Sequence, residues 1–238
     1  MLEISDATVR FGGVVALDHV SATFSQPVSG IIGPNGAGKT TLMNVISGFV
    51  SAKGQVRMEG QDLMRLAPHR RAHWGLRRSF QKEEIANDLT VSENVMVQLD
   101  FRLGKAGAKQ DDVARMLNFV GLADRADKSG DALNSFERRL TDVAKCMVGD
   151  PKLIMFDEPG GGLSVDETRH LGALIKSIHA ETGAQILVID HDVELISDIC
   201  TETLVLDFGR RIAFGPTPEV LADPKVKAAY LGTEEIKP

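Results

Sequence analysis

A glycine-rich run at residues 33–40 constrains this sequence more than any other feature. It fits the pattern G-x-x-x-x-G-K-[ST] at every position and lies between an expected buried strand at 30–32 and an expected helix at 40–48. Glycines let the backbone wrap closely around phosphates, so that consecutive N–H groups and the helix N-terminus face the negative charge. The run predicts a nucleotide-binding loop made of Gly33, Pro34, Asn35, Gly36, Ala37, Gly38, Lys39, Thr40 and Thr41.

Two residues of this loop have individual expected roles. Lys39 is expected to reach the β- and γ-phosphates of the nucleotide, and the Thr40 hydroxyl is expected to bind Mg²⁺. The alternative is a strand-to-helix turn whose glycines occur by chance, and the coincidence of motif and context disfavours it. ATP and Mg²⁺ are therefore the nucleotide and the metal ion that we expect.

A second pattern, an apolar strand that ends in two carboxylates, lies at residues 153–158. The apolar residues 153–156 are followed by Asp157 and Glu158. In P-loop proteins an aspartate at this place helps to hold Mg²⁺, and the glutamate could orient or deprotonate the attacking water. Two acids at a strand end are, taken alone, more often structural. Combined with the loop at 33–40, they favour a P-loop NTPase in which Asp157 binds the metal and Glu158 is catalytic.

The order of the expected elements indicates an α/β fold with a P-loop NTPase (RecA-like) core. Alternating segments in the first 30 residues predict antiparallel strands, and buried strands at 153–156 and 186–189 alternate with helices at 167–182 and 194–200. Apolar residues at spacings of three and four predict helices between them, one of which carries Val113, Met116, Leu117 and Val120 and ends at Gly121. We expect an antiparallel β subdomain at about 1–30 and 54–75, a P-loop core at 31–53 and 150–215, a helical insert at 85–148 and a C-terminal tail at 216–238.

Composition narrows the function classes. The chain has 238 residues, of which 43% are hydrophobic, and a formal charge of −6. These values exclude a disordered or coiled-coil array and argue against nucleic acid as a partner, because nucleic-acid binding uses a basic face. No apolar run approaches the roughly 20 residues of a spanning helix, and no leader pattern is present. With two separated cysteines, Cys146 and Cys200, a cytoplasmic location is expected.

Three more motifs follow the glycine-rich loop along the chain, and their order helps to identify the class of P-loop protein. Ser79-Phe80-Gln81 precedes the helical insert, Gly160-Gly161-Gly162-Leu163-Ser164 extends the second pattern, and His191 follows the strand at 186–189. Together with the P-loop, they resemble the nucleotide-binding subunit of an ABC transporter over essentially the whole chain, as a single domain at 1–238.

The resemblance implies a role for each motif. It implies that Phe11 stacks on adenine, that Gln81 contacts Mg²⁺ and water, and that His191 senses the γ-phosphate. It assigns the metal to Asp157 and catalysis to Glu158, and it places residues 164–166 across an interface between two ATP-binding subunits. Each residue alone has a structural alternative, such as core for Phe11, but their order around one P-loop makes coincidence implausible.

One motif departs from the family pattern. Where L-S-G-G-Q is expected, the sequence has Leu133 followed by Asn134, Ser135, Phe136 and Glu137. In the family this helix N-terminus is presented to the γ-phosphate held by the partner subunit, and Phe136 puts a bulky side chain where close approach is needed. Asn134 can still cap the helix. We expect one weakened composite site and favour a heterodimer with an unlike ATP-binding subunit.

Several stretches resemble the branched-chain amino-acid importer group, including residues 11–17, 89–95 and 212–232. This resemblance implies transmembrane permease subunits, an indirect link to a solute-binding protein and a peripheral place on the inner face of the membrane. The alternatives that stay open are the ATPase of a urea, amide or lipopolysaccharide system, a soluble non-transport ABC ATPase, and a subunit that binds ATP without hydrolysing it.

Two other features have less specific interpretations. Asp207-Phe208-Gly209 spells a protein-kinase metal motif, but no H-R-D loop precedes it, so a hairpin turn is expected. Five arginines precede Gln81, and a solvated basic face is favoured over lipid binding for Arg65, Arg70, Arg71, Arg77 and Arg78.

Overall fold

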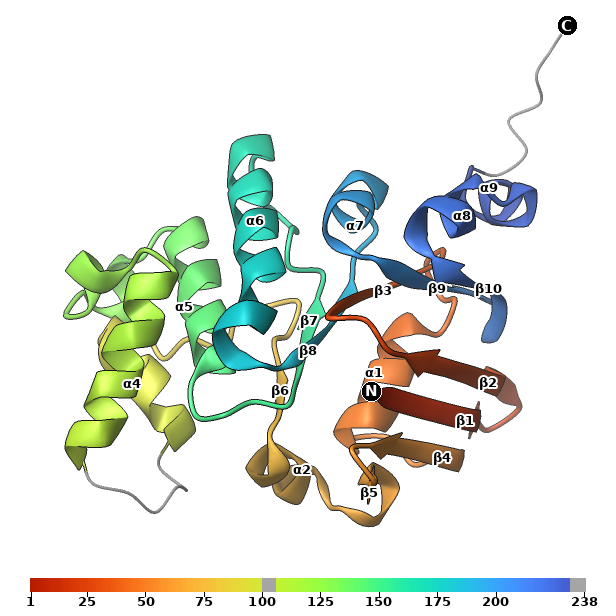
Figure 1. Ribbon diagram of the computed structural model, residues 1–238, viewed down its shortest axis with the longest axis horizontal. Coiled ribbons are helices and arrows are strands. Elements are labelled where there is room, and N and C mark those ends of the chain that lie inside the picture. Colours follow the sequence, from red (N-terminus) through yellow and green to blue (C-terminus); the bar gives the residue numbers. More distant parts are fainter. Residues whose placement is uncertain (100–105, 232–238) are drawn as a thin grey trace, which may run out of the picture. The chain divides into compact units, whose positions relative to one another are not determined.

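The computed structural model describes residues 1–99 and 106–231 and divides into two compact units (Figure 1). The first unit comprises Met1–Arg71 and the chain from Leu187 onward, and the second comprises Ala72–Ile186. The expected tail at 216–238 extends past residue 231, so its residues 232–238 lie outside the described part of the chain.

The N-terminal strands of the first unit form an antiparallel sheet. β1 (Leu2–Phe11) lies between β2 (Val14–Phe24) and β4 (Lys53–Met58), and β5 (Gln61–Asp62) pairs with β4. Every second residue of β2 from Val20 to Phe24 is buried, the alternation expected of a sheet with one face on a core. The antiparallel pairing predicted for the first 30 residues is confirmed.

The loop at 33–40 follows β3 (Val28–Ile32), a strand that is buried at every residue. β3 pairs in parallel with β9 (Glu202–Asp207), and β9 pairs antiparallel with β10 (Arg210–Pro216). Burial along the whole strand is typical of a parallel sheet covered on both faces. The Asp207-Phe208-Gly209 stretch makes the turn between β9 and β10, as predicted.

Short helices complete the first unit. α1 (Lys39–Ser47) buries Leu42, Val45 and Ile46, the apolar face expected from their spacing. The other elements are the turn η1 (Leu63–Arg65) and the helices α7 (Val193–Ile199), α8 (Thr217–Ala222) and α9 (Pro224–Leu231). Two elements contain residues of both units, namely α2 (Pro68–Trp74) and β8 (Gln185–Ile189).

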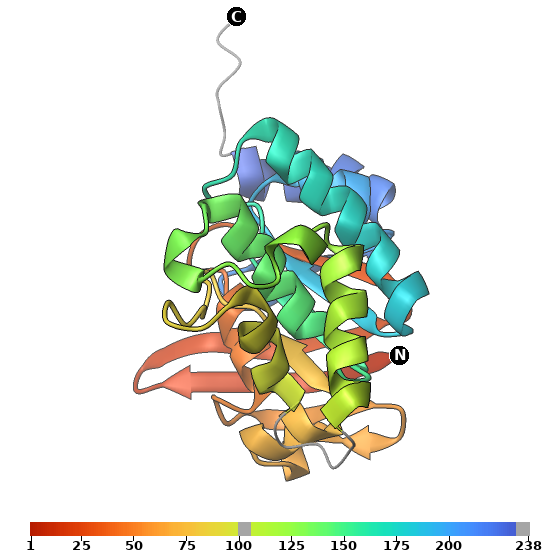
Figure 2. The ribbon, with the colours of Figure 1, turned by 90° about the vertical axis from the view of Figure 1, so that its left-hand side faces the viewer.

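The second unit pairs a short parallel sheet with helices. β6 (Leu76–Arg78) lies parallel to β7 (Leu153–Asp157). The helices are α3 (Val91–Met96), α4 (Ala106–Phe119), α5 (Ser135–Met147) and α6 (Val165–Thr182), with short turns η2 (Val97–Leu99), η3 (Ala123–Arg125) and η4 (Gly130–Ala132). In Figure 2, α4 and α5 lie side by side, and the apolar residues predicted to share one face of α4 are buried.

Both cysteines are free and buried. Cys146 lies on α5 in the second unit, and Cys200 follows α7 in the first. Burial raises the pKa of each thiol. None of the helices in the described ranges combines the length and apolar character needed to cross a bilayer.

Candidate nucleotide-binding site

The loop at 33–40 adopts a conformation that its glycines make accessible. Gly33 has a φ of 151°, and a Cβ built on it would lie 2.1 Å from the carbonyl oxygen of Leu206. Gly38 has a φ of 101°, and its Cβ would lie 2.7 Å from the carbonyl oxygen of Ala16. Side chains at these positions would strain the backbone and clash with main-chain atoms, so the loop requires glycine here.

The side chain of Lys39 folds over this loop. Its Nζ donates to the carbonyl oxygens of Gly33, at 2.7 Å, and Pro34, at 3.1 Å. Thr40 is exposed and Thr41 is half-buried on the same first turn of α1. The loop thus brings the Lys39 ammonium group and the N-terminus of α1 together, two features that favour a phosphate.

Arg71 supports the opposite end of α1. Its Nη1 donates to the carbonyl oxygens of Val45 and Ile46, both at 2.6 Å, and its Nε donates to that of Leu66 at 2.9 Å. A cation at a helix C-terminus satisfies carbonyls that have no partner within the helix and interacts favourably with the dipole. Burial lowers the pKa of Arg71. The interpretation of the basic residues before Gln81 as a solvated face is wrong for Arg71.

The interpretation as a solvated basic face is also wrong for the two arginines of the second unit, whereas the two remaining arginines are exposed. Arg77 is 5% exposed as a residue, and the side chain of Arg78 is 5% exposed. Arg65 and Arg70 are exposed. The sequence shows that the residues are basic, whereas burial depends on carbonyl and carboxylate partners that lie far along the chain, such as the carbonyl oxygen of Gly149 for Arg77.

Phe11 and His191, both in the first unit, present their side chains to solvent. Phe11 lies opposite Val14 at the tip of the β1–β2 hairpin and is 53% exposed. This exposure leaves its ring outside the core and available for stacking. The His191 side chain is 66% exposed, and its Nδ1 lies 3.5 Å from Oδ1 of the buried Asp190. The roles of both residues stay predictions.

The carboxylate pair lies at the end of β7 in the second unit. Asp157 is buried as the last residue of the strand, and Glu158 follows it with a φ of 52°. A left-handed backbone at a residue other than glycine costs on the order of 1 kcal/mol and clusters at functional sites. The glutamate is therefore held where an extended strand would not place it.

Residues 78–81 contact both carboxylates. Nη2 of Arg78 donates to Oδ2 of Asp157 at 2.8 Å, and Nε2 of Gln81 donates to Oε2 of Glu158 at 2.7 Å. The structure thus brings together Gln81 and Glu158, which were singled out from the sequence. It adds Arg78, whose contact with Asp157 was not predicted, because nothing in the sequence around Arg78 indicates a partner 79 residues away.

The segment at 134–137 begins α5. Asn134 is the N-cap, its Oδ1 accepts from the backbone N–H of Glu137 at 2.8 Å, and Oε2 of Glu137 accepts from the N–H of Asn134 at 3.0 Å. The cap expected from Asn134 is present. The ring of Phe136 is half-buried and lies against His170 of α6, with centroids 5.4 Å apart.

Comparison with known proteins supplies the family. The model of the ABC transporter family matches residues 17–161, more than half of the chain. The chain belongs to the ABC transporter family. A second model, for branched-chain amino acid ATP-binding cassette transporters, matches residues 210–236.

Curated relatives agree with this membership. The chain is 33% identical to the high-affinity branched-chain amino acid transport ATP-binding protein BraF of Pseudomonas aeruginosa, and 32% identical to LivG of Escherichia coli, a protein of the same description. Both matches cover 98% of this chain and 98% of the relative. The lipopolysaccharide export ATP-binding protein LptB of Haemophilus influenzae is 31% identical, with 88% of each chain covered.

Solved structures confirm the fold class predicted from the sequence. The ADP conformation of an ATP-binding cassette of an ABC transporter matches with a TM-score of 0.87 and 27% identity, covering 98% of both chains. A nucleotide-free ATP-binding cassette matches with a TM-score of 0.85 and 28% identity, covering 98% of this chain and 99% of that one. This ABC-family chain is an ATPase with the P-loop fold of these cassettes.

The donor set of the ABC-family chain suits magnesium. Within residues 1–99 and 106–231, no three His, Cys, Asp or Glu side chains form a cluster of their own for a metal. Mg²⁺ usually takes one or two protein carboxylates together with substrate phosphates and water. The Thr40 hydroxyl in the first unit, and the Asp157 carboxylate and Gln81 amide oxygen in the second, are each hard oxygen donors of the kind that this ion takes.

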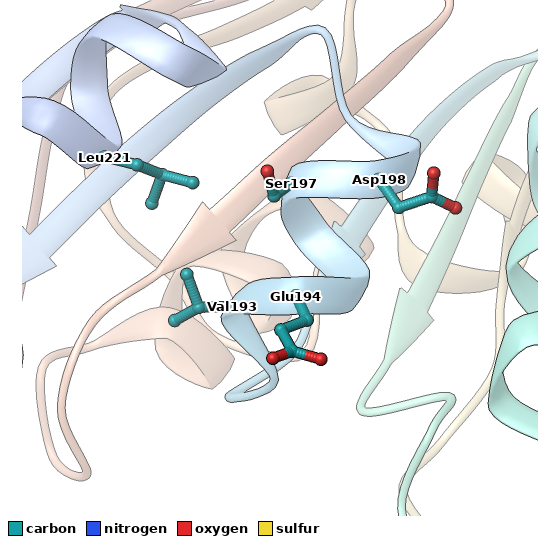
Figure 3. Close-up of a pocket in the computed structure, with 5 residues that line it drawn as sticks. All are labelled: Val193, Glu194, Ser197, Asp198 and Leu221. Atoms are coloured by element: carbon teal, nitrogen blue, oxygen red, sulfur yellow. The ribbon is translucent and has the colours of Figure 1, made fainter. Parts of the chain in front are cut away.

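A separate groove lies between α7 and α8 of the ABC-family chain (Figure 3). Leu221 of α8 points toward α7, whose residues complete the lining with Val193, Glu194, Ser197 and Asp198. The groove is open and its lining contains no residue of the predicted nucleotide site.

Proposed function

We propose that this chain hydrolyses ATP to power an ABC importer for branched-chain or related amino acids. The observation that carries the proposal is the loop at 33–40, with its left-handed glycines and the Lys39 ammonium folded over it. The relatives named for branched-chain amino acid transport, which match nearly end to end, support the substrate class. The lipopolysaccharide export relative covers less of the chain and does not displace it.

The proposed chemistry assigns one task to each group. The loop N–H groups and Lys39 bind the β- and γ-phosphates, and Phe11 stacks on the adenine ring. Asp157, Thr40 and Gln81 would hold Mg²⁺, which would supply positive charge to neutralise the phosphates. Glu158 orients the attacking water and accepts its proton, while Gln81 positions the Glu158 carboxylate through their hydrogen bond. His191 contacts the γ-phosphate.

The test is substitution of Glu158 by Gln in the chain co-expressed with an unlike ATP-binding subunit. The amide cannot accept the proton of water, so ATP turnover falls at least about a hundredfold while ATP binding is retained. Glu219→Gln is the matched control, because Glu219 is an exposed glutamate on α8. Unchanged turnover in the Glu158 variant would show that Glu158 takes no part in hydrolysis, and the proposed mechanism would fall.

The same proposal includes partners and placement. The chain pairs head to tail with a second ATP-binding subunit, docks on transmembrane permease subunits at the inner face of the membrane, and is linked through them to a solute-binding protein. Within it we assign 1–30 and 54–75 to a β subdomain, 31–53 and 150–215 to the P-loop core, 85–148 to the helical insert and 216–238 to the tail.

One of the two composite sites of that dimer is weakened. Asn134 and Phe136 replace the serine and a glycine of the family signature, and the carboxylate of Glu137 lies at the same helix end. An unlike partner with an intact signature would complete one competent site. We therefore expect faster ATP turnover when the chain is co-expressed with such a partner than when it is alone, measured as phosphate release. Brisk turnover by the chain alone would contradict the heterodimer.

A further inference from the structure

The ion pair between Arg78 and Asp157 has no part in the function proposed so far. The distance from Nη2 to Oδ2 is 2.8 Å, and the two side chains are only 5% and 8% exposed. Burying two charges is costly unless each compensates the other. The carboxylate expected to bind the metal ion therefore already has a cationic partner within its own chain.

The backbone around this pair is held in place. Arg78 is the last residue of β6, in parallel register with Met155 of β7. The N–H of Ser79 donates to the carbonyl oxygen of Met155 at 2.9 Å, and Ser79 Oγ accepts from the N–H of Asp157 at 3.3 Å. The guanidinium carbon also lies 5.0 Å from the centre of the Phe80 ring. Arg78 is thus a preorganised donor rather than a mobile surface arginine.

We propose that Arg78 is a positioning residue that competes with Mg²⁺ for Asp157. The inference rests on the proposed function, since it takes Asp157 as a ligand of the nucleotide-bound metal. A guanidinium and Mg²⁺ both bind carboxylate oxygens, and a fixed cation beside the carboxylate disfavours a second cation by Coulomb repulsion. Arg78 therefore raises the Mg²⁺ concentration that the site requires.

The competition has a functional consequence. Arg78 keeps the Asp157 carboxylate oriented before the metal arrives, while Gln81, three residues later, holds Glu158 at 2.7 Å. Residues 78–81 thus engage both acids of the pair. Metal binds firmly only when nucleotide phosphates add their own negative charge, so Arg78 makes Mg²⁺ binding depend on the nucleotide.

The experiment measures the metal requirement of nucleotide binding. ADP carrying a fluorescent N-methylanthraniloyl group is bound to the full chain at a subsaturating concentration, and Mg²⁺ is titrated. In Arg78→Gln the half-saturating Mg²⁺ concentration falls about tenfold, the effect of roughly one pK unit of competition, while binding in EDTA stays within about twofold of wild type. Arg78→Lys keeps the positive charge but lacks the planar guanidinium group, so in this variant the half-saturating Mg²⁺ concentration falls about threefold.

Controls separate competition from a structural role. Arg65→Gln, at an arginine whose side chain is 86% exposed, leaves the Mg²⁺ midpoint unchanged. In an Asp157→Asn background the Arg78→Gln substitution has no further effect on the midpoint, because the contested carboxylate is gone. Mn²⁺ in place of Mg²⁺, followed by the electron paramagnetic resonance signal of free Mn²⁺, gives the same order of midpoints without any measurement of turnover.

Two results overturn the inference. If folded Arg78→Gln has a Mg²⁺ midpoint equal to or higher than that of wild type, Arg78 does not compete with the metal. If Arg78→Gln fails to fold, a midpoint in Arg78→Lys equal to or higher than that of wild type leads to the same conclusion. The proposed function fails separately if wild-type protein binds no fluorescent ADP with or without Mg²⁺. If wild-type protein binds fluorescent ADP but its Mg²⁺ midpoint equals that of the Arg78 variants, only the proposed role of Arg78 is rejected.

Discussion

Two helices of this chain begin at segments expected to contact nucleotide, and their N-termini are built in opposite ways. α1 starts after Gly38, which has no side chain to cap it, and its first turn, Lys39-Thr40-Thr41, contains no acid. α5 starts after Asn134, which forms a reciprocal capping box with Glu137. The first helix leaves its N–H groups to an anion, whereas the second satisfies its own.

Charge sharpens the contrast between the two helix ends. Glu137 lies in the first turn of α5, where the hydrogen bond from Lys128 at 2.6 Å, the backbone bond from Asn134 and the nearby Arg125 lower its pKa. A carboxylate fixed at this end occupies the favourable field that a phosphate would use. The comparison teaches that a helix N-terminus serves a ligand only when the chain leaves it unsatisfied.

The largest expected effect on ATP turnover comes from removing the cation at the N-terminus of α1. Lys39→Met removes the ammonium that contacts the phosphates, so ATP turnover falls at least about a hundredfold. Phosphate release by the purified chain or its complex is the measurement. Lys53→Met, at an exposed lysine of β4, is the control and stays near wild type. A loss of less than fivefold in the Lys39 variant would mean that the loop does not depend on this cation.

The second effect comes from making the α5 end resemble the family pattern. Asn134→Ser with Phe136→Gly keeps a good N-cap and removes the ring beside the helix end, so turnover of the assembled complex rises about tenfold, or roughly 1.4 kcal/mol. His170→Ala removes only the ring partner of Phe136 and leaves turnover unchanged. If the double variant gained nothing, the carboxylate of Glu137 or the partner subunit would limit the site instead.

The smallest effect tests the body of α5 rather than its end. Burial raises the pKa of Asp142 from 3.8 to about 6, opposed by Lys145 and Arg139 and reinforced by Glu83 and Glu84. Between these two values the folded protein binds the proton more tightly than the unfolded chain. The contribution of this group to the free energy of unfolding therefore decreases as pH rises through that window.

Asp142→Asn removes this penalty. We expect its free energy of unfolding in urea to exceed that of wild type by about 1 kcal/mol at pH 7.5, with the difference vanishing near pH 4. Asp111→Asn, at an exposed aspartate of α4, shows no such pH-dependent difference. A destabilised Asn variant at pH 7.5 would show that the positive charges around Asp142 outweigh its desolvation.

Local patterns made much of the fold and part of the site predictable. The loop at 33–40, the buried strands, the α4 face and the β9–β10 turn all follow from spacing and from glycine positions, which act within a few residues. The capacity of Asn134 to cap α5 was likewise visible in the sequence. These features depend on neighbours along the chain, and the structure has them.

Long-range partners could not be predicted in the same way. The Arg78–Asp157 pair joins residues 79 positions apart, and the contact of Phe136 with His170 joins two helices. The burial of Arg71 depends on the carbonyls of a helix that ends more than 20 residues earlier. A single sequence shows the charge or the ring but not the group that meets it.

The burial of both cysteines makes the chain suited to site-specific labelling. Cys146 and Cys200 are buried, and burial raises the pKa of both thiols, so thiol-reactive dyes have little access to the natural residues. A cysteine introduced at Val165, which is 75% exposed at the start of α6, would be the reactive one. Fluorophores there could test the proposed pairing of two ATP-binding subunits without any prior change to the native thiols.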